Sequence, residues 1–276
     1  MNIEIQDDFD LKKIAESGQC FRCEDRGNGA WRIPYRELCL NISPAGTNAY
    51  ALDCSHSEWE SVWRIYFDLD TDYRSIRRRI DPLRDPFLYR ASEAGKGIRL
   101  LRQDPWETLV SFIISQNRNI PALRRSISFL CQAAGEKRRD RTGEAFDCFP
   151  ASEAILALDD SALAACRLGY RAKYVRAAAS AAAEGRFDPE SLMSAPEAET
   201  VSALTGLYGV GRKVAACVSL FGLHHLDAFP VDVWMRRVLE TEYPDGYPME
   251  LYRPVNGIFQ QYMFAYYRSL RNKLSV

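Results

Sequence analysis

The sequence has little of three features that would assign a protein class directly: net charge, cysteines in metal-binding patterns, and long apolar runs. Its 276 residues carry 36 lysines and arginines against 37 aspartates and glutamates, a formal charge of -1. The total charge therefore does not mark a nucleic-acid binder, whose balance is often basic. No apolar run approaches the roughly 18 residues that a membrane-spanning helix needs, so we expect no membrane partner.

The eight cysteines are scattered, and Cys20 and Cys23 form a lone CxxC pair. No second pair lies at zinc-binding spacing and no cysteine follows Cys217, so we expect neither a metal site nor an iron-sulfur cluster, and no cofactor. The N-terminus lacks the charged and apolar segments of a signal peptide. These features predict an intracellular, reduced protein.

Charged residues are unevenly distributed along the chain. Basic residues gather at 74–79, 136–141 and 167–176, whereas acidic residues dominate 53–72 and 184–199. If the basic segments meet in the fold, they build one positive face on a neutral protein. Solvated helix surfaces are the simpler alternative.

The pattern of apolar residues and turn signals along the chain changes near Gly97. From Asn2 to about Asp72, short apolar stretches alternate with turn signals, which predicts an antiparallel sheet. Helices follow, among them "DPWETLVSFIISQ", where Asp104 is the expected N-cap and Glu107 completes a capping box. We therefore predict an α+β protein with a small antiparallel sheet domain at 1–97 and an all-helical domain at 98–276.

Two further helical regions are expected. An alanine-rich stretch from 152 to 185 predicts two or three helices interrupted at "LGY", residues 168–170. The segment "NGIFQQYMFAYYRSLRN" predicts an amphipathic helix at the C-terminus.

The stretch "LTGLYGVGRKVAACVSLFG" predicts a helical hairpin at about residues 200–222. Gly209 and Gly211 are expected to supply positive φ and close backbone approach. The second helix would begin near Arg212, and free amide groups at its start can hold a phosphate. The alternative is a plain glycine turn between packed helices.

Lys213 falls in the first turn of the hairpin's second helix, where the positive helix end disfavours an ammonium group. Cys217 lies one helical turn further along the same side, so both residues can line one pocket. Asp232, in "PVDV", is placed to cap the next helix while its carboxylate faces the lysine. A capping role alone is the alternative for Asp232.

Five motifs in this order resemble those of the 8-oxoguanine DNA glycosylases, within the helix-hairpin-helix Gly-Pro-Asp superfamily. They are "SGQCFR", "GIRLLRQDPWETLVSFIISQNRNI", "LGYRAKYV", "GVGRKVA" and "PVDV". The resemblance implies a sheet domain of the TBP-like type ahead of the helical domain. It also implies a monomeric enzyme of base excision repair that acts on duplex DNA containing 8-oxoguanine, at the nucleoid if the source is bacterial.

The resemblance also implies a mechanism and residue roles. The damaged base is flipped out of the duplex, Lys213 attacks the sugar and forms a Schiff base, Asp232 stabilises the developing positive charge, and β-elimination cleaves the strand. The other implied roles are base recognition by Gly18, Cys217, Gln260 and Phe264, contact with the vacated stack or the estranged base by Asn117, Tyr170 and Arg171, and DNA backbone binding by Gly209, Gly211 and Arg212.

Three positions depart from the family pattern. Trp234 replaces a histidine after the catalytic aspartate, Cys23 replaces a tryptophan, and Ala122 replaces an arginine that reads the estranged cytosine. Trp234 and Cys23 bear on the phosphate contacts and the local packing, whereas Ala122 predicts a relaxed preference for the opposite base. The alternatives are another glycosylase specificity of the superfamily, disfavoured by the absent four-cysteine cluster and the present hairpin lysine, and a non-catalytic DNA-binding module, disfavoured by Lys213 with Asp232.

Overall fold

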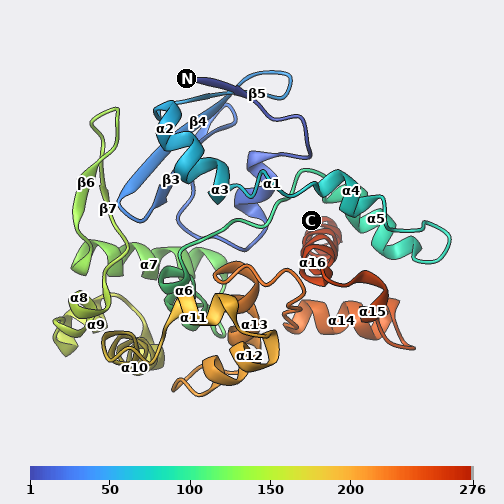
Figure 1. Cartoon of the computed structure of the whole chain (residues 1–276). Coiled ribbons are helices and arrows are strands. Elements are labelled where there is room, and N and C mark those ends of the chain that lie inside the picture. Colours follow the sequence, from blue (N-terminus) through green and yellow to red (C-terminus); the bar gives the residue numbers. More distant parts are fainter. Residues whose placement is uncertain (275–276) are drawn as a thin grey trace.

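The computed structural model, which describes residues 1–274, begins with a five-stranded antiparallel sheet (Figure 1). Its strands are β1 (Asn2–Glu4), β2 (Glu24–Gly27), β3 (Ala30–Tyr35), β4 (Leu38–Gly46) and β5 (Ala49–Leu52). The spatial order is β1-β5-β4-β3-β2, so every neighbouring pair except β1 and β5 is joined by a short hairpin. The left-handed turn residues Asn28 and Gly29 close the first of these hairpins.

Helices complete this first unit and bury one face of its sheet. They are α1 (Leu11–Glu16), α2 (His56–Glu58), the π-helical turn η1 (Trp59–Trp63) and α3 (Arg64–Tyr66). Trp63 and Phe67 are fully buried, and they share a core with Leu40 and Ile42 of β4. The prediction of a sheet from 2 to 72 is therefore right for the strands and wrong for these helices. A local signal was present, because the Oγ of Ser55 caps α2 by accepting from the amide of Glu58 at 3.1 Å.

The rest of the chain is mainly helical, which confirms the predicted fold class. Its helices are α4 (Tyr73–Arg77), α5 (Pro86–Ala94), α6 (Pro105–Ser115), α7 (Ile120–Ala134), α8 (Ser152–Leu156), α9 (Asp160–Ala165), the 3-10 turn η2 (Gly169–Arg171), α10 (Ala172–Ala183), α11 (Pro189–Ser194), α12 (Glu197–Thr205), α13 (Arg212–Phe221), α14 (Val233–Glu242), α15 (Met249–Tyr252) and α16 (Asn256–Leu274). Of the described helices, none combines the length and apolar character needed to cross a membrane.

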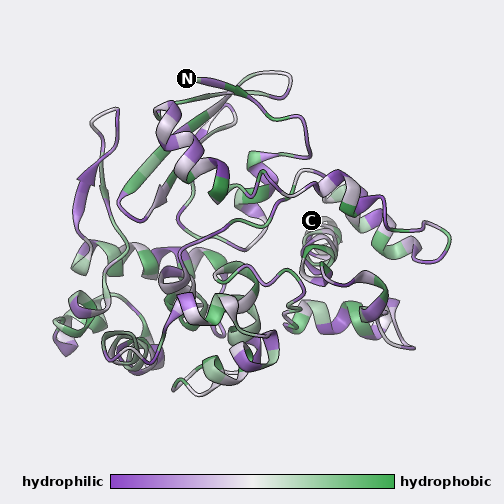
Figure 2. Cartoon of the chain, viewed as in Figure 1, coloured by the Kyte–Doolittle hydropathy of each residue, from purple (hydrophilic) through white to green (hydrophobic). Residues whose placement is uncertain are grey.

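A small β-hairpin interrupts the helices and was not predicted. Its strands are β6 (Lys137–Arg139) and β7 (Ala145–Asp147), and Figure 2 shows β6 as hydrophilic. It packs against the first unit through Arg32, a buried residue of β3 that pairs with Asp140 at 2.9 Å. Arg32 and Asp140 lie 108 residues apart, so the packing of this hairpin against the sheet is difficult to infer from local sequence.

The two units are joined by a buried arginine rather than a loose linker. Arg99 is fully buried and donates to the carboxylate of Asp7 at 2.9 Å and to the carbonyl of Phe67 at 3.1 Å. Helices α4 and α5 contribute Tyr73 and Leu88 to the core of the helical unit. The domain boundary near residue 97 stays a prediction.

Helix capping at Asp104 agrees in part with the prediction. Asp104 is the N-cap of α6, and its carboxylate accepts from the amide of Glu107 at 2.9 Å. The capping box is not completed, because the side chain of Glu107 pairs instead with Arg22 at 2.9 Å. Burial raises the pKa of Glu107, and Arg22 opposes that shift.

Candidate active site

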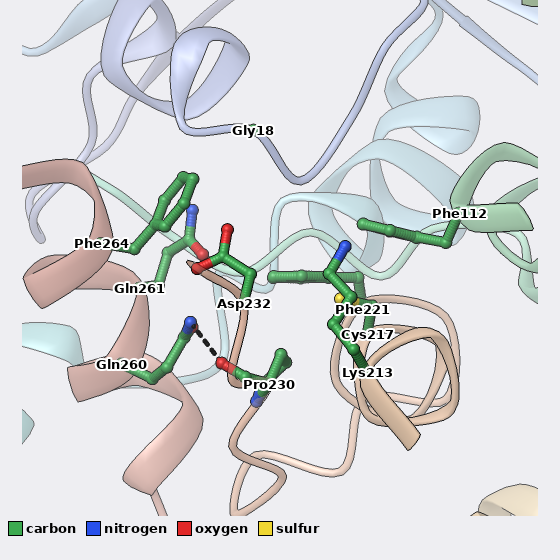
Figure 3. A pocket seen from close by; sticks show the side chains of 10 residues that line it. All are labelled: Gly18, Phe112, Lys213, Cys217, Phe221, Pro230, Asp232, Gln260, Gln261 and Phe264. Atoms are coloured by element: carbon green, nitrogen blue, oxygen red, sulfur yellow. Dashed lines mark hydrogen bonds between the residues drawn. The ribbon is translucent and has the colours of Figure 1, made fainter. Parts of the chain in front are cut away.

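A pocket of about 320 Å³ lies between α13, α16 and the loop after α1 (Figure 3). The residues that line it are Gly18, Phe112, Lys213, Cys217, Phe221, Pro230, Asp232, Gln260, Gln261 and Phe264. Six of the predicted site residues therefore meet in one cavity, although they span the chain from residue 18 to residue 264.

The helical hairpin positions Lys213. Helices α12 and α13 are joined by a turn in which Gly209 has φ +87°. A Cβ at Gly209 would lie 2.2 Å from the Cγ of Tyr174, so both the φ angle and the packing require glycine. Gly211 has φ -89° and ψ 172°, so the predicted positive φ is wrong there. It is the N-cap of α13, a position that takes extended backbone, and no neighbour lies within 4 Å of where its Cβ would be.

Lys213 is half-buried in the first turn of α13, as predicted. Its Nζ lies 5.0 Å from the centre of the Phe112 ring. Cys217 lies one turn further along and is buried, and burial raises the pKa of its thiol while the nearby Lys213 opposes that shift. The lysine therefore lies beside both an aromatic ring and a buried thiol.

Asp232 is both a helix cap and a wall of the pocket. Its Oδ1 accepts from the amide of Met235 at 2.8 Å and so caps α14. Figure 3 shows its carboxylate turned into the same cavity as the side chain of Lys213. Among the ion pairs of the described residues, none joins Lys213 to Asp232. The space between amine and carboxylate is thus open to a third group.

Helix α16 supplies the opposite wall. Gln260 and Phe264 are four residues apart and both line the pocket, as their spacing predicted. The Nε2 of Gln260 donates to the carbonyl of Pro230 at 3.0 Å (Figure 3). Its Oε1 is buried without a hydrogen-bond partner. A buried acceptor without a partner is costly, so this atom is suited to a donor group on a ligand.

The loop after α1 places Gly18 over Phe264. Gly18 has φ +88°, and a Cβ there would lie 3.2 Å from the Phe264 ring. The loop is held by Gln261, whose Nε2 donates to the carbonyl of Ser17 at 2.8 Å. It is also held by Gln19, whose side chain accepts from the amide of Leu101 at 2.7 Å. Gln261 was not among the predicted site residues, although it lies beside Gln260 on a helix predicted to line the pocket.

A wide groove of about 1,650 Å³ adjoins the pocket. The two cavities share Gly18, Phe112, Lys213, Asp232 and Phe264. The groove is also lined by residues of several other elements, among them Asn117, Gly211, Trp234, Arg236 and Arg268. The pocket therefore opens into a surface channel with cationic groups on its walls, and Trp234 lies on that channel.

The predicted intercalating residues are held together by hydrogen bonds. Asn117 has φ +50°, and its Nδ2 donates to the hydroxyl of Tyr170 at 3.1 Å. Tyr170 is 48% exposed, whereas Arg171 is buried. The Nε of Arg171 donates to the carbonyl of Gln116 at 2.7 Å, and its Nη2 contacts the same carbonyl and that of Asn117. In this conformation Arg171 fixes the backbone of the loop at residues 116–119, which we call the asparagine loop.

Three arginines of two basic segments pair with acids within the protein. Arg77 pairs with Asp8 at 2.5 Å, and Arg141 pairs with Glu58 at 2.6 Å. Arg138 pairs with Glu136 at 2.9 Å. These pairs reduce the free positive charge of the two segments, and one face built from all three segments stays a prediction. Among the described residues, no group of three or more metal-binding side chains occurs.

Comparison with known proteins places the chain among DNA repair enzymes. Residues 2–109 match the family described as 8-oxoguanine DNA glycosylase, N-terminal domain. Residues 110–244 match the family described as HhH-GPD superfamily base excision DNA repair protein. The two matches together cover the sheet unit, the hairpin and Asp232.

Relatives of known structure align over nearly the whole chain. MBOgg1, solved in complex with a low-affinity DNA ligand, is 35% identical with a TM-score of 0.91, covering 98% of this chain and 96% of its own. The 8-oxoguanine glycosylase/lyase of Clostridium acetobutylicum, solved with DNA containing cytosine opposite 8-oxoguanine, is 31% identical with a TM-score of 0.87, covering 98% of both chains.

A curated relative is the N-glycosylase/DNA lyase of Saccharomyces cerevisiae, 33% identical over 189 residues, which are 64% of this chain and 50% of the yeast protein. The chain spans about half the length of the curated relatives that it matches.

Proposed function

The chain belongs to the 8-oxoguanine DNA glycosylases of the helix-hairpin-helix Gly-Pro-Asp superfamily, and we propose that it excises 8-oxoguanine from duplex DNA and cleaves the strand at the resulting site. The observation that carries this proposal is the meeting of Lys213 and Asp232 in one pocket that opens into a wide groove. We further propose that it acts as a monomer on DNA inside the cell.

Lys213 is the proposed nucleophile. Its neutral amine attacks C1′ of the flipped nucleotide, and the bond between C1′ and N9 breaks with its electrons leaving on the base, which takes up a proton. Opening of the sugar then gives an imine between Lys213 and C1′. The imine acidifies the proton on C2′, and loss of that proton expels the 3′ phosphate by β-elimination. The first step uses the neutral form of the amine.

Asp232 is the proposed electrostatic partner. Its carboxylate stabilises the positive charge that develops on the sugar as the base departs. The capping bond to Met235 uses one carboxylate oxygen and fixes the side chain in place. Because the charge is already held in position, little reorganisation is needed in the transition state.

The remaining pocket residues are proposed to select the base. The carbonyl of Gly18 accepts from N7–H, the hydrogen that 8-oxoguanine carries and guanine lacks. The unpartnered Oε1 of Gln260 accepts from the Watson–Crick edge. Phe264 and Cys217 approach the cavity from α16 and α13 respectively, in agreement with contacts on the two faces of a planar base (Figure 3).

The asparagine loop and the hairpin are proposed to bind the duplex. Asn117 and Tyr170 fill the space that the flipped base leaves, which offsets part of the few kcal/mol lost on unstacking. Amides at Gly209 and Gly211 and the side chain of Arg212 bind the backbone. Arg171 is proposed to contact the estranged base after the loop rearranges, because its guanidinium is buried in this conformation.

The proposal is tested by trapping the imine. The protein is incubated with sodium borohydride and one of four duplexes carrying 8-oxoguanine, thymine glycol, an alkylated adenine or no lesion. We expect a covalent adduct with the 8-oxoguanine duplex alone. An adduct or base release confined to another lesion would indicate a different glycosylase specificity, and binding with neither adduct nor base release would indicate a non-catalytic DNA-binding module.

A further inference from the structure

A lysine outside the pocket and the groove is held over two tyrosines at the hairpin turn. Lys173 is exposed on the first turn of α10. Its Nζ lies 5.3 Å from the centre of the Tyr174 ring and 5.7 Å from the centre of the Tyr208 ring. Hydrogen bonding to Tyr208 raises the pKa of Lys173. The ammonium group therefore lies beside both rings, next to the hairpin turn.

This cation has no carboxylate partner among the ion pairs of the described residues, whereas several arginines of the basic segments are paired with acids. Arg77 and Arg141 are each paired with an acid. In the segment 167–176, Arg176 pairs with Asp160 at 2.7 Å and Arg171 is buried. Lys173 thus remains available to an anion from outside the protein.

The two tyrosines beside Lys173 pack against the hairpin turn. Tyr208 precedes Gly209 in the turn and is 59% exposed, and its ring packs edge-on against Tyr174 at 5.1 Å. Tyr174 in turn packs directly against Gly209, where a Cβ would lie 2.2 Å away. Gln116 ties the same turn to the asparagine loop by donating to the carbonyl of Gly209 at 3.0 Å. Packing therefore fixes the two tyrosine rings beside Lys173 relative to the hairpin turn.

We propose that Lys173 and the hydroxyl of Tyr208 bind a DNA backbone phosphate next to the one held by the amides of the hairpin. Each DNA strand carries one phosphate per about 3.4 Å of helix axis, so a strand that enters the hairpin presents a further phosphate to a neighbouring cation. The aromatic rings orient the ammonium, and the tyrosine hydroxyl adds a neutral donor. The proposal rests on the proposed function in taking DNA as the ligand.

The salt dependence of DNA binding tests this site. Binding to an 8-oxoguanine duplex is measured by fluorescence anisotropy across a salt series, in the Lys213→Gln background so that the DNA stays intact. For Lys173→Gln we expect weaker binding. The slope of the logarithm of the binding constant against the logarithm of the salt concentration should be shallower by about 0.9, the value for one phosphate. Tyr208→Phe should weaken binding about two- to twelvefold, the effect of one hydrogen bond. Lys96→Gln, an exposed lysine between α5 and α6, is the matched control and should leave the slope unchanged.

A neutral methylphosphonate scan locates the phosphate. Replacing one particular DNA phosphate near the lesion with a methylphosphonate should weaken binding of the protein that retains Lys173. The same replacement should not change the binding of Lys173→Gln. An unchanged slope in Lys173→Gln, an equal change in Lys96→Gln, or the absence of such a linkage would each overturn the proposal. Borohydride trapping of the unsubstituted protein distinguishes failure of the phosphate site from failure of the proposed function. If the unsubstituted protein forms the adduct and Lys173→Gln leaves the salt dependence unchanged, only the phosphate site is disproved.

Discussion

The Nε2 of Gln260 donates to the carbonyl of Pro230 at 3.0 Å and so ties helix α16 to the segment that carries Asp232 two residues later. Both partners are buried. The side chain proposed to read the base is therefore also a support for the carboxylate proposed to act on the sugar. Base recognition and sugar chemistry are expected to be coupled through this bond.

Replacing Lys213 with glutamine should abolish base release and borohydride trapping together, because both require the amine. Duplex binding should be largely retained, since the hairpin and groove are unaltered. The measurements are single-turnover excision, gel analysis of the adduct, and anisotropy, with Lys96→Gln as the exposed-lysine control. Base excision at a rate near that of the unsubstituted protein would contradict the assignment.

Two substitutions at Asp232 should separate its cap from its charge. Asp232→Asn keeps an acceptor for the Met235 amide, so we expect stability near that of the original and a rate lower by about 10²–10³-fold. Asp232→Ala should lower the rate similarly and also destabilise the protein by about 1 kcal/mol, because the cap is lost. Denaturant unfolding measures the stability of each variant, and single-turnover kinetics measures its excision rate. A fully active Asp232→Asn protein would show that Asp232 acts only as a helix cap.

The two hairpin glycines should respond differently to alanine. Gly209→Ala places a Cβ against the Tyr174 ring at a positive φ, so we expect a clear loss of thermal stability and of DNA binding. Gly211→Ala meets no neighbour within 4 Å and has an ordinary φ, so the fold should keep its melting temperature. Its DNA affinity should still fall, because the methyl group covers amides meant for phosphate. Equal melting temperatures for both variants would contradict this reading of the turn.

Gln261 is expected to act on base selection through Gly18. Gln261→Met removes the donor to the carbonyl of Ser17 and leaves a buried acceptor unpaired, which should cost about 1–3 kcal/mol of stability. The measurement that separates positioning from stability is the ratio of excision rates for 8-oxoguanine and guanine, taken well below the melting temperature. We expect this ratio to fall, and an unchanged ratio would assign Gln261 a purely structural role.

Discrimination among opposite bases should be weak. Ala122 offers no group to a base, and its amide is already bonded to the side chain of Asn119 at 2.9 Å. Arg124 does not compensate, because it turns toward the carbonyls of Cys23 and Ala15, at 3.5 and 3.4 Å. Loss of one charged contact to a base removes about 1–3 kcal/mol, or roughly five- to 150-fold, of discrimination.

The test of that expectation is single-turnover excision of 8-oxoguanine opposite each of the four bases, repeated with Ala122→Arg. The arginine should raise the preference for cytosine. A preference of several hundredfold in the original protein, or ratios unchanged by the arginine, would show that another group reads the estranged base.

Features set by local backbone chemistry were predictable from sequence. The caps at Asp104 and Asp232, the start of α13 and the left-handed turn at Gly209 each depend on residues within about one helical turn. The family motifs then indicated which of these local features meet in one site. Gly211 shows the limit of local sequence patterns. Both glycines of the turn were predicted to have positive φ, but only Gly209, which packs against Tyr174, has it.

Contacts between distant segments were decided by the tertiary structure alone. Gln261 supports Ser17 across 244 positions of sequence, and Arg171 reaches the carbonyl of Gln116 across 55. Their side chains could equally have been solvated, because no local rule chooses between a buried carbonyl and water as a hydrogen-bond partner. The packing of α16 and η2 against the loops makes that choice by excluding water, and it thereby determines which polar residues face the pocket and which ones hold it in shape.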